Sequence, residues 1–310
     1  IDGMNNIDRI IIGCNKIDFH LLKICVASIR YWNSEIPIFI IKDELNGTFD
    51  TSSLENNWDV NLYPCALKKL GWGIGTLIPL CTVSNKRCLY LDADVVLLGD
   101  ITTDLNKIDS DIIVSPDTPD NIREHIENAY FSLSRIKKID PNFEVPEFVF
   151  NTGHLVYNEG ILAKELFDTF IDWQSVPPNV LDKDTFRFAD QSILNFLLTK
   201  LLREGKLSIE RHQFNIWGFD EQTLNQVSLT DIGNKKGNQK LIHWAGLKTN
   251  HIQGMPRADI LGFYEDYYYA KVRYGKIQKH FSHVIQWKKE AVFLTKKMVV
   301  RIRDKTLSLR

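Results

Sequence analysis

Along the chain, short runs of apolar residues alternate with segments in which apolar residues recur at the spacing of a helix. Short apolar runs, typical of buried strands, occur at Arg9–Gly13, Ile36–Ile41, Asp59–Tyr63, Arg87–Leu98, Asp111–Ser115 and His154–Tyr157. Between them, the helical spacing of apolar residues predicts helices from Asp18 to about Tyr31 and at Thr76–Val83, Asn121–Lys138, Ile161–Trp173 and Asp190–Leu202. Strands that alternate with helices predict an α/β fold, in which a mostly parallel, Rossmann-like sheet is covered by helices on both faces.

The apolar run Arg87–Leu98 carries two carboxylates, Asp92 and Asp94, in its middle. Because burying an unpaired charge is costly, two acids within a buried strand need a compensating partner. Residues i and i+2 of an extended chain point to the same side, so both acids could bind one cation where the strand leaves the sheet. Oxygen ligands suit Mg²⁺ or Mn²⁺. The alternative is a structural role at a turn, which we expect for Asp100 after Gly99.

Polar residues follow several of the predicted strands. Gly13 and Asn15 end the first, and Asp117 follows the strand at Asp111–Ser115. In open α/β sheets, ligands bind beyond the carboxyl ends of the strands, so we expect these residues to lie near the acidic pair. Asp117 is either a further contact to the bound ligand or a turn residue.

The composition is that of a globular protein, with 44% apolar and 25% charged residues among 310. No run of 18 apolar residues occurs, so we expect no membrane-spanning helix. The polar start of the chain does not resemble a secretory signal. The five cysteines lie mostly in apolar contexts without metal-ligand spacing, which favours reduced thiols in a cytoplasmic protein.

The C-terminal segment is strongly basic although the net charge of the chain is −1. Residues 271–310 contain twelve Lys or Arg and two acids, interleaved with aromatic and aliphatic residues. We therefore predict a domain at 1–255 and a basic helical extension at 256–310. Such an extension suits an anionic membrane surface at the inner face of the membrane; the alternative is a terminal helix packed on the domain with a solvated basic face. No recognition motif accompanies the charge, so we expect no nucleic-acid partner.

Four segments, in order, resemble glycosyltransferase family 8, whose retaining enzymes have the GT-A fold. The first is Leu91-Asp92-Ala93-Asp94-Val95-Val96-Leu97, which is similar to the Asp-x-Asp strand of that family. The others are Phe150-Asn151-Thr152-Gly153, Ala189-Asp190-Gln191-Ser192-Ile193-Leu194-Asn195 and Ile242-His243-Trp244-Ala245-Gly246-Leu247-Lys248. The resemblance covers about residues 9 to 255, most of the chain.

The resemblance implies a metal-dependent transfer of a hexose from a nucleotide-diphospho-sugar, UDP-glucose or UDP-galactose. It implies that Asp92, Asp94 and His243 hold Mn²⁺ (or Mg²⁺), with Asp92 also near the ribose. Gly246 would let the backbone approach the diphosphate and Lys248 would neutralise it. The acidic nucleotide contact that the family has after its first strand is replaced here by Cys14-Asn15.

On the sugar side, the resemblance implies that Asp190 binds donor hydroxyls and that Gln191 lies near the anomeric carbon. Asn151 and Gly153 would line the sugar pocket. The neutral amide of Gln191 is a poor nucleophile, so retention would proceed by same-face attack, with the departing phosphate oxygen as base. The expected acceptor is a glycan or a lipid-linked glycan.

Two other functions remain open from the sequence. The chain could be a non-catalytic nucleotide-sugar-binding module of the same fold. It could also be an inverting GT-A transferase, for which Asp117 or Asp220 are candidate bases.

Overall fold

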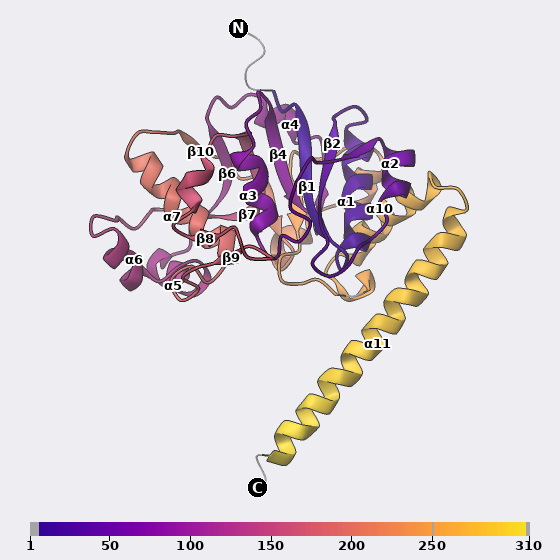
Figure 1. The fold of residues 1–310 in the computed structure, drawn as a ribbon. Helices are drawn as coiled ribbons and strands as arrows, with labels where there is room; N and C mark the ends of the chain where they lie inside the picture. Colours follow the sequence, from indigo (N-terminus) through magenta and orange to yellow (C-terminus); the bar gives the residue numbers. More distant parts are fainter. Residues whose placement is uncertain (1–5, 250, 308–310) are drawn as a thin grey trace.

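The central layer of the protein is a seven-stranded β-sheet (Figure 1). The structure, a computed structural model, describes residues 6–249 and 251–307. The strand order is β10-β6-β7-β4-β1-β2-β3, and neighbouring strands are parallel except where β7 pairs with β4 and β6. The strands are β1 (Arg9–Asn15), β2 (Ile38–Asp43), β3 (Val60–Leu62), β4 (Arg87–Asp92), β6 (Ile112–Asp117), β7 (Val149–Asn158) and β10 (Ile209–Arg211). The predicted mostly parallel sheet is confirmed.

Helices cover both faces of this sheet. They are α1 (Phe19–Trp32), α2 (Ser52–Trp58), α3 (Ile74–Cys81), α4 (Thr102–Leu105), α5 (Ile122–Ala129), α6 (Leu133–Ile139), η1 (Lys164–Phe167), α7 (Ala189–Arg203), α8 (Glu221–Leu224), α9 (Leu229–Gly233), η2 (Ile252–Gly254), α10 (Ala258–Ala270) and α11 (Gly275–Leu307). Alternate residues of β1 enter different cores: Ile10 and Ile12 pack with α1 and α10, whereas Ile11 packs with α3 and α7. Both faces are therefore buried, which explains why the strands read as continuous apolar runs.

The acidic pair lies at a bend between two sheets, not within one strand as predicted. β4 ends at Asp92, Ala93 and Asp94 form a turn, and β5 (Val95–Leu97) joins a second sheet with β12 (Leu241–His243) and β11 (Asn215–Trp217). The apolar run is unbroken in sequence because both halves are buried. A third, two-stranded sheet pairs β8 (Ile171–Asp172) with β9 (Asn179–Val180).

Two predicted helices differ in the structure. The segment Asn121–Lys138 is two helices, α5 and α6, because Tyr130 and Phe131 between them turn into the core. The segment Ile161–Trp173 contains only the short η1, followed by strand β8. The segment is largely irregular, but several of its aromatic side chains, among them Phe167 and Phe170, are buried in the core. Their spacing in the sequence imitates that of a helix.

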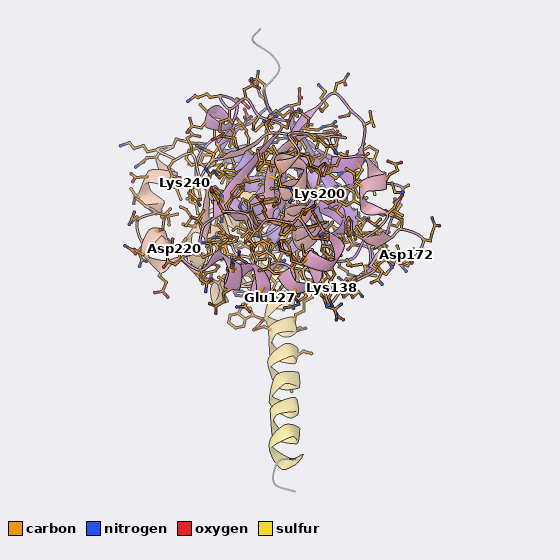
Figure 2. All side chains as sticks on the ribbon, turned by 90° about the vertical axis from the view of Figure 1, so that its left-hand side faces the viewer. Glu127, Lys138, Asp172, Lys200, Asp220 and Lys240 are labelled. Carbon is orange, nitrogen blue, oxygen red and sulfur yellow. The ribbon has the colours of Figure 1, made fainter. Side chains whose placement is uncertain are left out.

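The C-terminal helix α11 projects from the body as a single long rod (Figures 1 and 2). It is attached near its start, where Lys279 and His283 contact the buried Glu265 of α10 at 3.3 and 2.8 Å. α10 packs on α1 and so belongs to the body, whereas most of α11 extends away from it (Figure 1). The predicted division into domains at residue 255 stays a prediction. Among the described residues, no helix is both long and apolar enough to cross a membrane. The side chains at 293, 294 and 296–307, and all of residues 308–310, lie outside the described part; they include Phe293, Leu294, Met298, Val299 and Val300 of the predicted membrane-facing set.

Candidate active site

The carboxyl ends of three neighbouring parallel strands meet at one edge of the sheet. β1 ends at Asn15, β2 at Asp43 and β4 at Asp92. A cavity of about 690 Å³ opens at this edge, which is the size of a site for a nucleotide-sized ligand. The predicted position of the site, beyond the strand ends, agrees with the observed cavity.

Asp92, Asp94 and His243 converge at the floor of this cavity. His243 pairs with Val95 across the antiparallel β12–β5 ladder, and the backbone N–H of Trp244 donates to the carbonyl of Asp94. Nε2 of His243 lies 3.4 Å from Oδ1 of Asp94 and 3.8 Å from Oδ2 of Asp92. The three potential ligand atoms all lie within 4.8 Å of one another, so the bend brings together residues that are 150 positions apart in sequence.

The donor set fits a divalent cation. Asp94 and His243 are buried, and Oδ1 of Asp94 has no hydrogen-bond partner within the described chain. A buried carboxylate oxygen without a partner is costly, and a bound cation would remove that cost. Two carboxylates and one imidazole nitrogen are ligands that Mn²⁺ accepts more readily than Mg²⁺ does.

The electrostatics of the site favour cation binding. Burial and the neighbouring Asp94 raise the pKa of Asp92 to about 6. Burial also opposes ionisation of Asp94, but His243 and Lys248 hold its pKa well below the ordinary value. For His243, burial acts to lower the pKa, but the two carboxylates raise it above the ordinary value. His243 and Lys248 thus compensate the charge of Asp94, whereas burial and the charge of Asp94 still oppose ionisation of Asp92.

Lys248 completes the positive side of the site. Its Nζ lies 3.0 Å from Oδ2 of Asp18 and 3.6 Å from Oδ2 of Asp94. Asp18 precedes α1 but does not cap it with its side chain, which instead accepts from Lys248 and from Nδ2 of Asn15. Gly246 has a φ of +73° and open space where a Cβ would be, which leaves the backbone accessible to a ligand.

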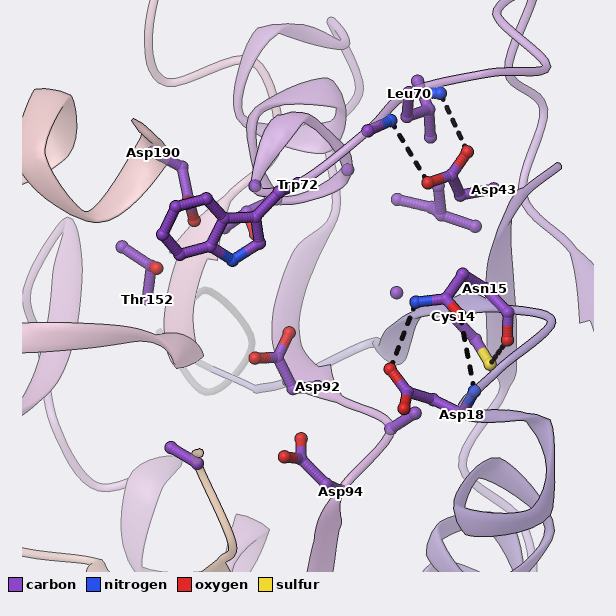
Figure 3. A pocket seen from close by; sticks show the side chains of 18 of the residues that line it. Cys14, Asn15, Asp18, Asp43, Leu70, Trp72, Asp92, Asp94, Thr152 and Asp190 are labelled. Atoms are coloured by element: carbon purple, nitrogen blue, oxygen red, sulfur yellow. Dashed lines mark hydrogen bonds between the residues drawn. The ribbon is translucent and has the colours of Figure 1, made fainter. Parts of the chain in front are cut away.

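The opposite wall is formed by the start of α7 and by β7. Nδ2 of Asn151 donates to Oε1 of Gln191 at 2.7 Å, and Nε2 of Gln191 donates to the carbonyl of Ala129 at 3.1 Å. Both ends of the Gln191 amide are therefore fixed. Burial raises the pKa of Asp190 to about 7, although contacts with Thr152 and Thr76 act against the shift. Figure 3 shows Asp190 beside Thr152 and across the cavity from Asp94.

A sequence-family model described as "Glycosyl transferase family 8" matches residues 76–249, more than half of the chain. The chain belongs to glycosyltransferase family 8. The resemblance that its four motifs suggested is thereby confirmed, and with it the assignment as a glycosyltransferase that uses a nucleotide-sugar donor.

Solved structures of similar fold agree with a GT-A glycosyltransferase. The bifunctional glycosyltransferase WbbM, in its apo form, superposes with a TM-score of 0.52 and 11% identity over 88% of this chain and 51% of that one. The galactosyltransferase LgtC, in complex with donor and acceptor sugar analogues, superposes with a TM-score of 0.52 and 16% identity. The match covers 86% of this chain and 96% of LgtC. The chain thus spans about half the length of WbbM and nearly all of LgtC. At these identities the similarity shows the fold alone. No curated protein matches the sequence.

The family-8 cavity gathers nearly all of the residues predicted for it. Its lining includes Gly13, Asn15, Asp92, Asp94, Asn151, Asp190, Gln191, His243, Gly246 and Lys248. Their individual roles in binding and catalysis stay predictions.

Gly153, Asn15 and Asp117 also make contacts that hold the surrounding structure. Gly153 does not line the cavity but lies beneath it: a Cβ there would fall 2.5 Å from Oδ2 of Asp92 and 2.6 Å from Cε1 of His243. It therefore leaves room for the acidic cluster, and a role beside the sugar stays a prediction. The side-chain oxygen of Asn15 accepts from the N–H of Ile17, so this amide holds the loop after β1. Asp117 lies outside the cavity lining and accepts from Tyr130 and Trp217.

Other lining residues were not predicted from the sequence. Asp43 accepts the backbone N–H groups of Leu70 and Gly71, and so fixes the loop that carries Trp72 (Figure 3). Trp72 is 68% exposed and packs edge-on against Phe188. Asp43 could have been found from its place at the end of the second strand, the same rule that located Asn15. Nothing local in the sequence marks Phe188.

Proposed function

We propose that the protein transfers a hexose from UDP-glucose or UDP-galactose to a glycan or lipid-linked glycan, in a reaction that depends on a divalent cation and retains the anomeric configuration. The observation that carries this proposal is the cluster of Asp92, Asp94 and His243 at the strand-end edge of the cavity. The proposal refines the family assignment in donor, metal, stereochemistry and acceptor.

Asp92, Asp94 and His243 are the residues that would hold Mn²⁺ or Mg²⁺. The ion would supply Lewis-acid stabilisation of the charge that develops on the departing diphosphate. Lys248 is held beside Asp94 and would place a second positive charge against the same phosphates. Gly246 leaves the adjacent backbone open to them, and Gly13 and Asn15 would contact the nucleoside beyond β1.

Asp190, Gln191 and Asn151 would receive the sugar. The Gln191 amide cannot rotate without losing two hydrogen bonds, so it presents a fixed face to the anomeric carbon. A neutral amide is a poor nucleophile, and we therefore favour same-face attack by the acceptor over a covalent intermediate. In that pathway the acceptor hydroxyl gives its proton to the departing phosphate oxygen.

We also propose that α11 and the following residues lie on the anionic inner face of a membrane, where a lipid-linked acceptor would be found. Its described part exposes Phe281, Ile285, Trp287 and Val292 together with Lys288 and Lys289. Aromatic and aliphatic residues interleaved with bases suit the headgroup region of anionic lipids. The proposal implies a cytoplasmic protein at the membrane periphery.

The test is the variant Asp94→Asn, with Asp104→Asn of α4, an exposed carboxylate outside the cavity, as the matched control. Hydrolysis of UDP-glucose and UDP-galactose in the presence of Mn²⁺ needs no acceptor. We expect Asp94→Asn to lower the rate of donor hydrolysis by about 100-fold or more and to leave the thermal midpoint unchanged. The control should retain full activity. Undiminished hydrolysis by Asp94→Asn with all metal chelated would refute the proposal.

No observation favours the inverting alternative. Asp117 hydrogen-bonds to two neighbours and Asp220 caps α8 through the N–H of Thr223, and neither lines the cavity. The anomeric configuration of the product, measured by NMR, distinguishes the two outcomes. Binding of UDP and Mn²⁺ in calorimetry without turnover would instead favour a binding module.

A further inference from the structure

The second ring nitrogen of His243 has no hydrogen bond. A metal-ligating histidine ordinarily donates its other ring N–H to a carboxylate or carbonyl, which fixes the orientation of the ring. Nδ1 of His243 is buried and lacks any partner in the described residues. Another contact must therefore hold the ring so that Nε2 faces Asp92 and Asp94.

Aromatic rings surround His243 on two sides. Trp217 is its direct neighbour on the parallel β11–β12 ladder, and the two rings stack with centroids 5.6 Å apart and planes inclined by 27°. The ring of His154 on β7 approaches at 5.4 Å and 88°. Rotation of the imidazole would force it into one of these rings, so packing restricts its orientation.

Trp217 is itself fixed by hydrogen bonding and stacking. Its indole Nε1 donates to Oδ1 of Asp117 at 3.2 Å, and the hydroxyl of Tyr130 donates to Oδ2 of the same carboxylate at 3.1 Å. Phe219 also stacks on the indole, with centroids 5.5 Å apart and planes inclined by 9°. The carboxylate that would usually orient a metal-binding histidine here orients the tryptophan beside it.

We propose that Trp217 is a positioning residue for the divalent-cation site and that Asp117 acts on that site through Trp217. The inference rests on the proposed metal dependence and adds the residues that fix the imidazole ligand. Asp117 orients the indole, the indole face holds the imidazole, and the imidazole directs Nε2 toward the two carboxylates. Neither Trp217 nor Asp117 is among the residues that line the cavity.

The test is the dissociation constant of Mn²⁺, measured by calorimetry in the presence of UDP. Trp217→Leu removes the stack and should raise the constant by about tenfold, as loss of the support for a ligand does elsewhere. Trp217→Phe keeps an aromatic face and loses only the indole N–H, so its increase should be smaller. Asp117→Asn keeps an acceptor oxygen and should resemble the wild type, whereas Asp117→Ala should weaken binding.

The matched control is Trp173→Leu, which removes a tryptophan that follows β8 and does not line the cavity. It should leave Mn²⁺ affinity unchanged. A second readout is the pulsed electron-spin signal of bound Mn²⁺, in which modulation from a coordinated imidazole nitrogen should weaken in Trp217→Leu. General loss of packing would not produce that change together with a retained thermal midpoint.

Mn²⁺ affinity within twofold of the wild type in a folded Trp217→Leu variant overturns the inference. If that variant fails to fold, Asp117→Ala decides, since it frees the indole without removing it: a raised constant supports the inference and an unchanged one overturns it. Failure of the wild type to bind Mn²⁺ with UDP would reject the metal dependence itself. Failure of the inference would thus be seen in the variants, whereas failure of the proposed metal dependence would be seen in the wild type.

Discussion

At the scale of single residues, the acidic cluster depends on the absence of a Cβ atom at Gly153. Gly153 has no side chain, and the space its Cβ would occupy is taken by Asp92, His243 and Oδ1 of Asn151. Asp190 and Asp94 are both buried, but their pKa values shift in opposite directions. Burial dominates for Asp190, and neighbouring positive charge dominates for Asp94.

We expect Gly153→Ala to weaken Mn²⁺ binding and donor hydrolysis by at least about tenfold, because the new methyl group must displace a metal ligand. Calorimetry with Mn²⁺ and UDP measures the effect. Gly262→Ala is the matched control: this glycine lies inside α10 with open space around it, so the same change should raise stability by about 0.5–1 kcal/mol. Equal Mn²⁺ affinity in the wild type and Gly153→Ala would contradict this account.

The raised pKa of Asp190 predicts how stability depends on pH. The folded protein keeps this proton up to about pH 7, whereas the unfolded chain releases it near its ordinary value of 3.8. The free energy of unfolding therefore falls as pH rises through this interval, by about 1.4 kcal/mol per unit at most. Asp190→Asn should consequently gain stability over the wild type at pH 8 and not at pH 4.

Denaturant unfolding at the two pH values measures this difference. Asp182→Asn should behave in the opposite sense, because a hydrogen bond from Thr185 lowers the pKa of that exposed carboxylate. Its stabilising contribution exists above the ordinary pKa and is lost as pH falls. A gain for Asp190→Asn of the same size at both pH values would show that ionisation is not the cause.

At the scale of elements, loops and helix starts bring the cavity walls together. The loop Gly71–Gly73 is tied to the end of β2 through Asp43 and meets α7 at Gly73, where a Cβ would lie 2.1 Å from Oδ1 of Asp190. α7 is in turn fixed to β7 because the amide of Asn195 accepts from the N–H of Phe150 and donates to its carbonyl. The donor-side wall is thus one hydrogen-bonded unit.

Gly73→Ala should displace Asp190 and lower donor hydrolysis about tenfold or more, while the affinity for UDP stays close to that of the wild type. Gly205→Ala is the matched control, because Gly205 shares the positive φ but has no neighbour within 4 Å. It should cost about 1–2 kcal/mol of stability and leave hydrolysis unchanged. An equal effect of both variants on hydrolysis would assign the loss to backbone strain.

At the scale of the whole molecule, the body and α11 have different surroundings. The body buries two cores on either side of one sheet, whereas α11 leaves it after Trp287 (Figure 1). Up to that point Lys279 and His283 contact Glu265, and the ring of Trp287 packs on His251. A long helix without packing partners is marginal in water, and bases on such a helix attract an anionic surface. Membrane binding and catalysis should therefore be separable.

Truncation after Glu290 tests this separation. It removes six of the twelve Lys and Arg residues of 271–310 and keeps the contacts with Glu265. Cosedimentation with phosphatidylglycerol vesicles should fall by about tenfold or more, since each base near the surface contributes about 1 kcal/mol, and donor hydrolysis should not change. Phosphatidylcholine vesicles are the control. Equal cosedimentation of both chains would show that these residues do not bind the membrane.

The amino-acid pattern was enough to predict the alternation of strands and helices, the sheet type and most of the cavity lining. It did so because buried strands must be apolar on both faces and because parallel strands expose their carboxyl ends at one edge. The four family motifs added residues from α7 and β12 that no local pattern connects to the Asp-x-Asp segment. Hydrophobic patterns and family motifs can both be read from the sequence without knowing how the elements pack.

Contacts between segments that are distant in sequence are visible only in the folded protein. The bend at Ala93 separates two sheets, although the run around it reads as one strand, because both halves are buried in different partners. Tyr130 divides a predicted helix since its ring enters the core. The stack of Trp217 on His243, and the space that Gly153 leaves, depend on contacts between strands distant in sequence. Such contacts follow from how the sheets pack, which hydrophobic periodicity does not encode.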